Sequence, residues 1–84
     1  MFAKQSIEDW IDYHVDQGDG SAKDLRLKAQ NAIDRKRAGQ VCDVCESVPI
    51  WAAVDAIAET GMCFHCTTGE ADNSEDYEFA EVCF

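Results

Sequence analysis

The sequence predicts a mostly α-helical fold made of a helical hairpin, a small four-cysteine module that contains a helix, and an acidic C-terminal tail. Three observations predict it. Apolar residues recur at helical spacing in the N-terminal half, two Cys-x-x-Cys pairs follow, and the last segment is rich in Asp and Glu with little periodicity. We place these segments at positions 1–41, 42–66 and 67–84 of one compact domain.

The first helix is expected to begin after Ser6 and to end at the turn of positions 17–20. Ser6 is a favoured N-cap residue, and Glu8 and Asp9 place negative charge at the positive end of the helix dipole. His14 lies on the apolar face, where we interpret it as a partly buried packing residue. That face consists of Ile7, Trp10, Ile11, His14 and Val15.

A second helix is expected to begin after Ser21 and to end at Gly39. Asp24 stands three residues after Ser21, as in a capping box, and glycine is a common residue just beyond a helix. We interpret its basic side chains as a solvated face that pairs with acids of the first helix or of the tail. The apolar face consists of Leu25, Ala29, Ala32 and Ile33, and the basic residues are Lys23, Arg26, Lys28, Arg35, Lys36 and Arg37.

The segment between the cysteine pairs predicts a third, short helix. Pro49 suits a first helical turn, and Gly61 is the expected C-cap. Residues 67–74 are expected to form a loop. Residues 76–84 leave three possibilities open: a short helix, a strand that folds back on the module, or a segment that orders on contact with a partner. The apolar face of the third helix consists of Ile50, Trp51, Val54, Ile57 and Ala58.

The candidate metal ligands are Cys42, Cys45, Cys63 and Cys66, and their spacing is typical of a tetrahedral structural zinc site. Two residues between cysteines allow both thiolates to turn toward one Zn²⁺ ion. The alternatives are two buried cysteine pairs or redox-active motifs, and the latter are disfavoured because neither pair lies in a βαβ pattern.

Two further residues compete in principle as ligands. His65 lies inside the second pair, and we expect it beside the metal site or exposed to solvent. Cys83 is expected to be a small apolar residue of the tail. A site closed by four sulfurs leaves no open position for a substrate, and no other catalytic set is present, so the sequence predicts no enzyme.

The net charge of −10 is unevenly distributed. All 7 Lys and Arg residues lie in positions 1–41, whereas positions 42–84 contain ten acids and no Lys or Arg. Nucleic-acid binding requires basic patches, so direct contact of the cysteine module with DNA or RNA is disfavoured, and anionic membranes are disfavoured for the same reason. A basic groove of another protein is the favoured kind of partner.

The thiols are expected to be reduced. No apolar signal segment follows positions 1–4, and the apolar run at positions 48–54 is too short to cross a bilayer. The odd number of cysteines, 5, also suits a full set of disulfides poorly. We therefore expect a cytoplasmic protein.

The pattern Cys42-x2-Cys45-x17-Cys63-x2-Cys66 resembles that of the DksA/TraR family of bacterial and phage-borne transcription factors. The resemblance covers roughly positions 22–66, and Pro49 and Ala52 lie near the family's Pro-Ile-rich start of a helix. Glu46 stands where the family commonly has glycine.

This resemblance implies a helical segment followed by a zinc module. It also implies binding to RNA polymerase by insertion of an acidic helical tip into the channel that leads to the active site, without direct promoter contact. By this resemblance, Asp16 and Asp19 at the turn are the candidate partner-binding residues, with Ala22 just beyond.

Two functions therefore compete. The first is a small zinc-binding transcription regulator that binds RNA polymerase through the helical hairpin. The second is an acidic inhibitor or adaptor, with a phage as one alternative source, that occupies a basic groove of a host protein by imitating nucleic acid. A zinc-module DNA binder that uses the basic second helix is disfavoured by the charge of −10.

Overall fold

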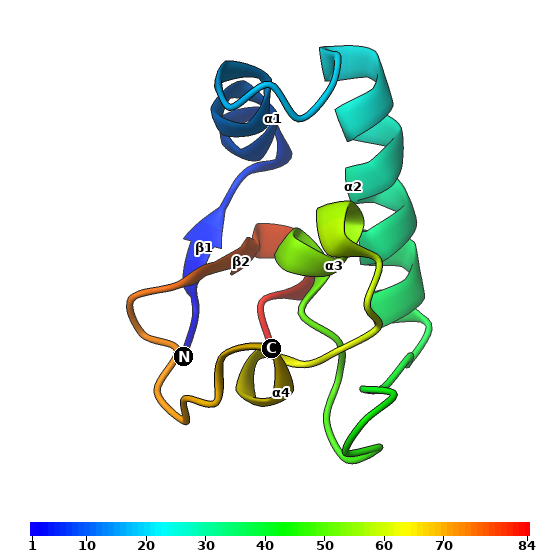
Figure 1. The fold of residues 1–84 in the computed structure, drawn as a ribbon, viewed down its shortest axis with the longest axis vertical. Helices are drawn as coiled ribbons and strands as arrows, with labels where there is room; N and C mark the ends of the chain where they lie inside the picture. Colours follow the sequence, from blue (N-terminus) through cyan, green and yellow to red (C-terminus); the bar gives the residue numbers. More distant parts are fainter.

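The computed structural model describes residues 1–84 and shows a mostly helical fold. In Figure 1, α2 runs along one side of the molecule, α1 lies at one end, α4 lies at the other, and the strands and α3 lie between them. In chain order the elements are β1 (Ala3–Gln5), α1 (Ile7–Asp16), α2 (Ala22–Arg37), α3 (Ala52–Ala58), α4 (Phe64–Thr68), β2 (Tyr77–Phe79) and the 3₁₀-helix η1 (Ala80–Val82).

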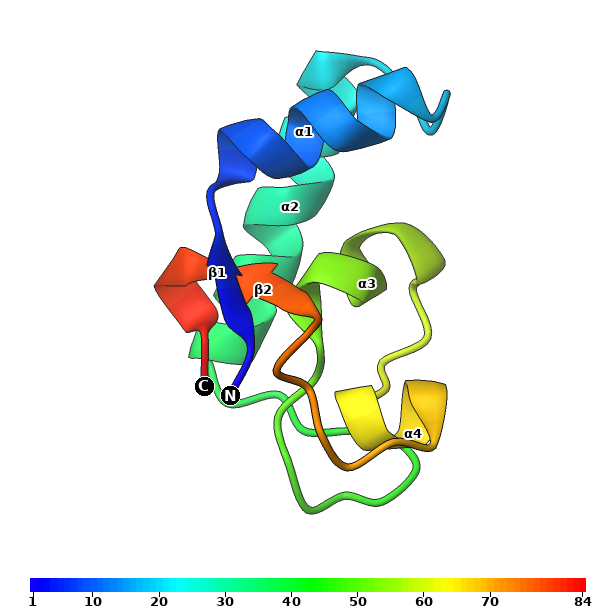
Figure 2. The same cartoon turned by 90° about the vertical axis from the view of Figure 1, so that its left-hand side faces the viewer.

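The two N-terminal helices begin where their sequence predicts. The hydroxyl of Ser6 accepts a hydrogen bond from the backbone N–H of Asp9 at 3.1 Å, and that of Ser21 accepts one from Asp24 at 3.2 Å. Each hydroxyl satisfies one of the free N–H groups of a first helical turn. Figure 2 shows α1 lying across the N-terminal end of α2, so that the rest of α2 is left to pack on α3.

The apolar core joins all the main elements. The predicted buried face of α2 is confirmed, because its four apolar residues are fully buried. Trp10 and Ile11 of α1, three of the four alanines of α3, and Phe79 and Val82 of the C-terminal segment pack in the same cluster. The core therefore includes part of the segment that the sequence marks as an acidic tail.

An N-terminal strand, β1, is present that the sequence pattern does not predict. β1 pairs with β2 in parallel, with Ala3 opposite Tyr77 and Gln5 opposite Phe79. Of the three possibilities left open for residues 76–84, the structure has the strand, followed by one 3₁₀ turn. The two chain ends lie side by side, since the Cys83 thiol is 3.4 Å from the carbonyl oxygen of Phe2.

Several predictions about individual residues are wrong. Pro49 is not in a first helical turn: α3 begins at Ala52, and Pro49 forms an isolated bridge with Val41. Gly61 is not the C-cap of the third helix: α3 ends at Ala58, and Glu59 is its cap in the left-handed conformation, with φ of 54°. Lys36 is not solvated, because only 1% of its surface is exposed and it forms a buried ion pair with Glu78 of the tail at 3.0 Å. None of the helices combines the length and the apolar character needed to cross a membrane.

Candidate metal centre

The four cysteines of the two pairs come together at the end of the molecule opposite α1. Their sulfur atoms all lie within 4.8 Å of one another, although the pairs are far apart in the sequence. Cys42 and Cys63 are buried, Cys66 is half-buried, and Cys45 is exposed. The cluster could hold a metal ion.

The first pair lies in a tight loop that directs backbone N–H groups at sulfur. The Sγ of Cys42 accepts hydrogen bonds from the N–H of Val44 at 3.3 Å and of Cys45 at 3.5 Å. Glu46 then turns the chain with φ of 56°, a left-handed conformation that favours glycine. A hydrogen bond of 2.8 Å from the N–H of Cys42 to the carbonyl of Val48 closes the loop.

The second pair lies at the start of α4. Cys63 is the N-cap of this helix, and its Sγ accepts a hydrogen bond from the N–H of Cys66 at 3.4 Å. The hydroxyl of Thr67 donates to the carbonyl of Cys63 at 2.7 Å, which fixes the turn. His65, between the two cysteines, is exposed and its Nδ1 lies 3.1 Å from the carbonyl oxygen of Glu70. The imidazole is therefore not part of the sulfur cluster, as expected.

Gly61 joins the two pairs. Its carbonyl accepts a 2.8 Å hydrogen bond from the N–H of Asp43, and its own N–H donates to Oδ1 of Asp55 at 2.6 Å. Gly61 has φ of 67°, and a side-chain carbon there would overlap the carboxylate of Asp43. The sequence predicts this glycine at a helix end, whereas in the structure it allows the two cysteine loops to approach each other closely.

Asp55 anchors this junction to α2. The carboxylate is 1% exposed, and its second oxygen, Oδ2, lies 2.6 Å from a guanidinium nitrogen of Arg35. The sequence placed Arg35 on a solvated face and did not single out Asp55, so their pairing was not predicted. The available signal was a single acid among the alanines of the predicted third helix, because a charge on a buried helix face needs a partner.

The thiols do not titrate alike. Burial opposes ionisation of Cys42, but the N–H groups of Cys45, Cys63 and Val44 and the thiol of Cys66 outweigh it and lower the Cys42 pKa to about 6. The neighbouring thiols, that of Cys42 first, raise the pKa of Cys66 to about 12. The cluster therefore holds negative charge at neutral pH, which favours a cation at its centre.

The dimensions of the cluster suit a tetrahedral ion. Four sulfurs at about 2.3 Å from a central zinc would lie about 3.8 Å from one another. The Sγ atoms of Cys45 and Cys63 are 3.8 Å apart. The cysteines are free rather than joined in disulfides, so all four sulfur atoms are available as ligands.

The other residues singled out from the sequence lie away from this centre. Asp16 ends α1 and Ala22 begins α2, and both are exposed. Asp19, in the turn between them, contacts Nδ1 of His14 through Oδ2 at 2.7 Å. His14 is a packing residue, as predicted: its side chain is 17% exposed and its ring lies 4.6 Å from that of Trp10.

Comparisons with protein-family models, curated proteins and solved structures return no match to this chain. The resemblance to the DksA/TraR family therefore stays a prediction. Function has to be inferred from the contacts of these 84 residues.

Proposed function

We propose that this chain is a small zinc-binding protein without catalytic activity, which uses the metal to hold its shape and acts by binding another protein. The observation that carries the proposal is the cluster of four cysteine sulfurs within 4.8 Å. Four thiolates fill the tetrahedral positions of a Zn²⁺ ion and leave none for water or substrate. Such a site supplies rigidity and no chemistry.

Zinc is favoured by the donor set. Soft sulfur ligands in a tetrahedral array suit zinc or iron, and the N–H groups directed at Cys42 stabilise its thiolate. The zinc form is colourless, whereas iron held by thiolates absorbs visible light. Elemental analysis and an absorbance spectrum of protein purified without added metal therefore separate the two.

Within this class, we propose RNA polymerase as the partner and transcription regulation as the role. Support comes from the cysteine spacing and from the position of the acidic turn. Asp16, Asp19 and Ala22 lie at the junction of α1 and α2, at the end of the molecule away from the cysteine loops (Figure 1). A partner could contact this turn while the metal centre holds the opposite end.

Direct binding to purified bacterial RNA polymerase tests this proposal. Replacing Asp16 and Asp19 by Asn in one variant keeps side-chain size and removes two charges from the turn. The matched control replaces Asp9 and Asp12, which are exposed on the same helix, in the same way. The proposal predicts that the first variant loses affinity and the control does not. No binding by the unaltered chain, or equal binding by both variants, would contradict it.

One observation favours the alternative, an acidic adaptor that occupies a basic groove. In positions 42–84 the only carboxylates paired with a base are the buried Asp55 and Glu78. Binding that falls steeply with salt, and that is lost when Glu70, Asp72 and Glu75 are neutralised, would favour this function. The exposed acids of this half are Asp43, Glu46, Glu59, Glu70, Asp72, Glu75 and Glu81.

A further inference from the structure

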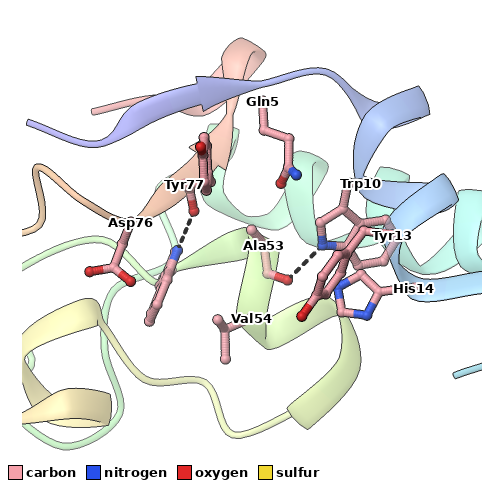
Figure 3. Close-up of a pocket in the computed structure, with 9 residues that line it drawn as sticks. Gln5, Trp10, Tyr13, His14, Ala53, Val54, Asp76 and Tyr77 are labelled. Atoms are coloured by element: carbon pink, nitrogen blue, oxygen red, sulfur yellow. Dashed lines mark hydrogen bonds between the residues drawn. The ribbon is translucent and has the colours of Figure 1, made fainter. Parts of the chain in front are cut away.

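We propose that a cavity between α1, α3 and β2 binds a cationic side chain, arginine or lysine, of a protein partner. The cavity has a volume of about 400 Å³ and lies on the side of α3 that faces α1 (Figure 3). It is separate from the cysteine cluster, and it adjoins the acidic turn through His14, which lines the cavity and contacts Asp19. The inference rests on the proposed function, since it supplies the chemistry by which the partner is recognised.

The cavity is lined mainly by aromatic rings. Trp10 and Trp51 are almost fully buried, and their indole N–H groups donate to the carbonyls of Ala53 at 3.0 Å and Tyr77 at 2.9 Å. These bonds hold both indoles in place, as the dashed lines in Figure 3 show. Tyr13 and Tyr77 complete the lining and are 57% and 54% exposed. The two phenol rings therefore supply most of the aromatic surface that a ligand can reach, next to two fixed indoles that are almost fully buried.

The charge in and around the cavity is negative. Asp76 is the only acid that lines it, no Lys or Arg does, and this carboxylate forms no ion pair within the chain. His14 also lines the cavity, but its Nδ1 contacts the carboxylate of Asp19 at 2.7 Å, which places a second acid beside it. The chain as a whole carries a net charge of −10.

Aromatic rings next to a carboxylate select cations. The face of an indole or phenol ring attracts a cation through its quadrupole, and a flat guanidinium also stacks on it. Asp76 adds a direct ionic partner, and the amide of Gln5, which points into the cavity in Figure 3, adds a polar one. A neutral apolar side chain would leave Asp76 without a partner, and an anionic one would be repelled.

The fluorescence of the two tryptophans tests the inference directly, because the chain has 2 Trp residues and both line the cavity. The probes are three blocked pentapeptides in which two arginines, two lysines or two norleucines alternate with glycine. Norleucine has the apolar stem of lysine without its charge. The arginine and lysine peptides are expected to change the emission in a saturable manner, and the norleucine peptide is expected not to.

Two pairs of variants separate this cavity from general attraction to an acidic protein. Asp76→Asn is compared with Glu75→Gln, which removes the same charge from the neighbouring exposed position. Tyr13→Leu is compared with Tyr13→Phe, which keeps the ring. The first member of each pair should weaken peptide binding about fivefold, and the second by less than about twofold. Unchanged circular dichroism shows that each variant is folded.

Equal responses to the norleucine and arginine peptides, or equal losses in Asp76→Asn and Glu75→Gln, would overturn the inference. So would the absence of any response to the charged peptides. If partner binding persists in that case, the proposed function stands and only the cavity assignment fails. If the charged peptides bind as expected but RNA polymerase does not, the partner is wrong and the cavity assignment stands.

Discussion

Lys36 and Glu78 form an ion pair that is cut off from solvent, and both charged groups make further hydrogen bonds. Lys36 Nζ donates to Glu78 Oε2 at 3.0 Å and to the carbonyl of Phe84 at 2.8 Å. The Glu78 carboxylate also accepts the N–H groups of Ala52 and Ala53, both at 2.8 Å. Burying two charges costs free energy, and the attraction between them in good geometry roughly offsets that cost. The main effect of the pair is therefore to fix how α2, α3 and β2 meet, rather than to add net stability.

Removal of one member of this pair should be costly. Lys36→Met leaves the Glu78 carboxylate buried beside an apolar side chain, and we expect the free energy of unfolding to fall by about 3–5 kcal/mol in a chemical-denaturation experiment. The matched control is Lys23→Met, at an exposed position of the same helix, which should change it by less than about 0.5 kcal/mol. Similar values for both variants would show that the buried pair does not fix the fold.

Glu59 is held in a conformation that glycine adopts more readily. Its φ of 54° at the end of α3 strains a residue that has a side chain. Glu59→Gly should therefore raise the unfolding free energy by about 1 kcal/mol, measured by thermal or chemical unfolding. Ala58→Gly, one residue earlier and still helical, should lower it by about the same amount. If both substitutions destabilise equally, strain at Glu59 is absent.

At the scale of elements, the C-terminal strand links the two ends of the chain. β2 pairs with β1, while Phe79 and Val82 are fully buried in the core. A strand pair of this length has little stability by itself, so packing must hold it. Most acids of the last segment therefore lie on its exposed side, whereas Glu78 is fully buried and paired with Lys36.

Truncation tests the role of this element. A chain that ends at Asp76 lacks Glu78, Phe79 and Val82, and we expect it to lose cooperative unfolding and to exchange backbone amide hydrogens rapidly throughout. Substitution of Glu81 by Gln, at an exposed position of the same segment, should leave unfolding unchanged. Cooperative unfolding of the truncated chain would identify residues 77–84 as a dispensable arm.

The cysteine loops should bind metal in a pH-dependent way. Thiolate is the ligand, so a metal displaces protons, and affinity falls as pH falls. Cys66, with its pKa raised to about 12, keeps a proton to be displaced throughout the neutral range, whereas Cys42, with its pKa lowered to about 6, is already ionised there. Below about pH 6 the metal must also displace the proton of Cys42. The slope of log affinity against pH, measured by competition with a chelator, should therefore increase by about one in that range. A constant slope would contradict these pKa values.

At the scale of the whole molecule, the parts that the sequence predicted are those encoded locally. The N-caps Ser6 and Ser21, the apolar face of α2 and the two cysteine pairs each depend on residues a few positions apart. β1 was missed because three residues carry no periodicity and its partner β2 lies some seventy positions away. The burial of Lys36 and Asp55 was missed for the same reason, since each is satisfied by a residue from another element.

The size of the molecule explains why a metal is expected. A chain of 84 residues buries a small core, here drawn from short helices rich in alanine. Domains of this kind have a net stability of about 5–15 kcal/mol, and structural zinc contributes about 10 kcal/mol or more in finger peptides. The metal would therefore decide whether the half that contains α3 and α4 is folded at all.

The most direct test is to remove the metal and follow the fold. Protein purified without added metal should contain one zinc ion per chain, and a strong chelator should abolish cooperative unfolding, as followed by circular dichroism and the fluorescence of Trp51 in a Trp10→Phe background. Stoichiometric zinc should restore both signals. A natively purified chain with no stoichiometric metal, whose fold the chelator leaves unchanged, would contradict the account.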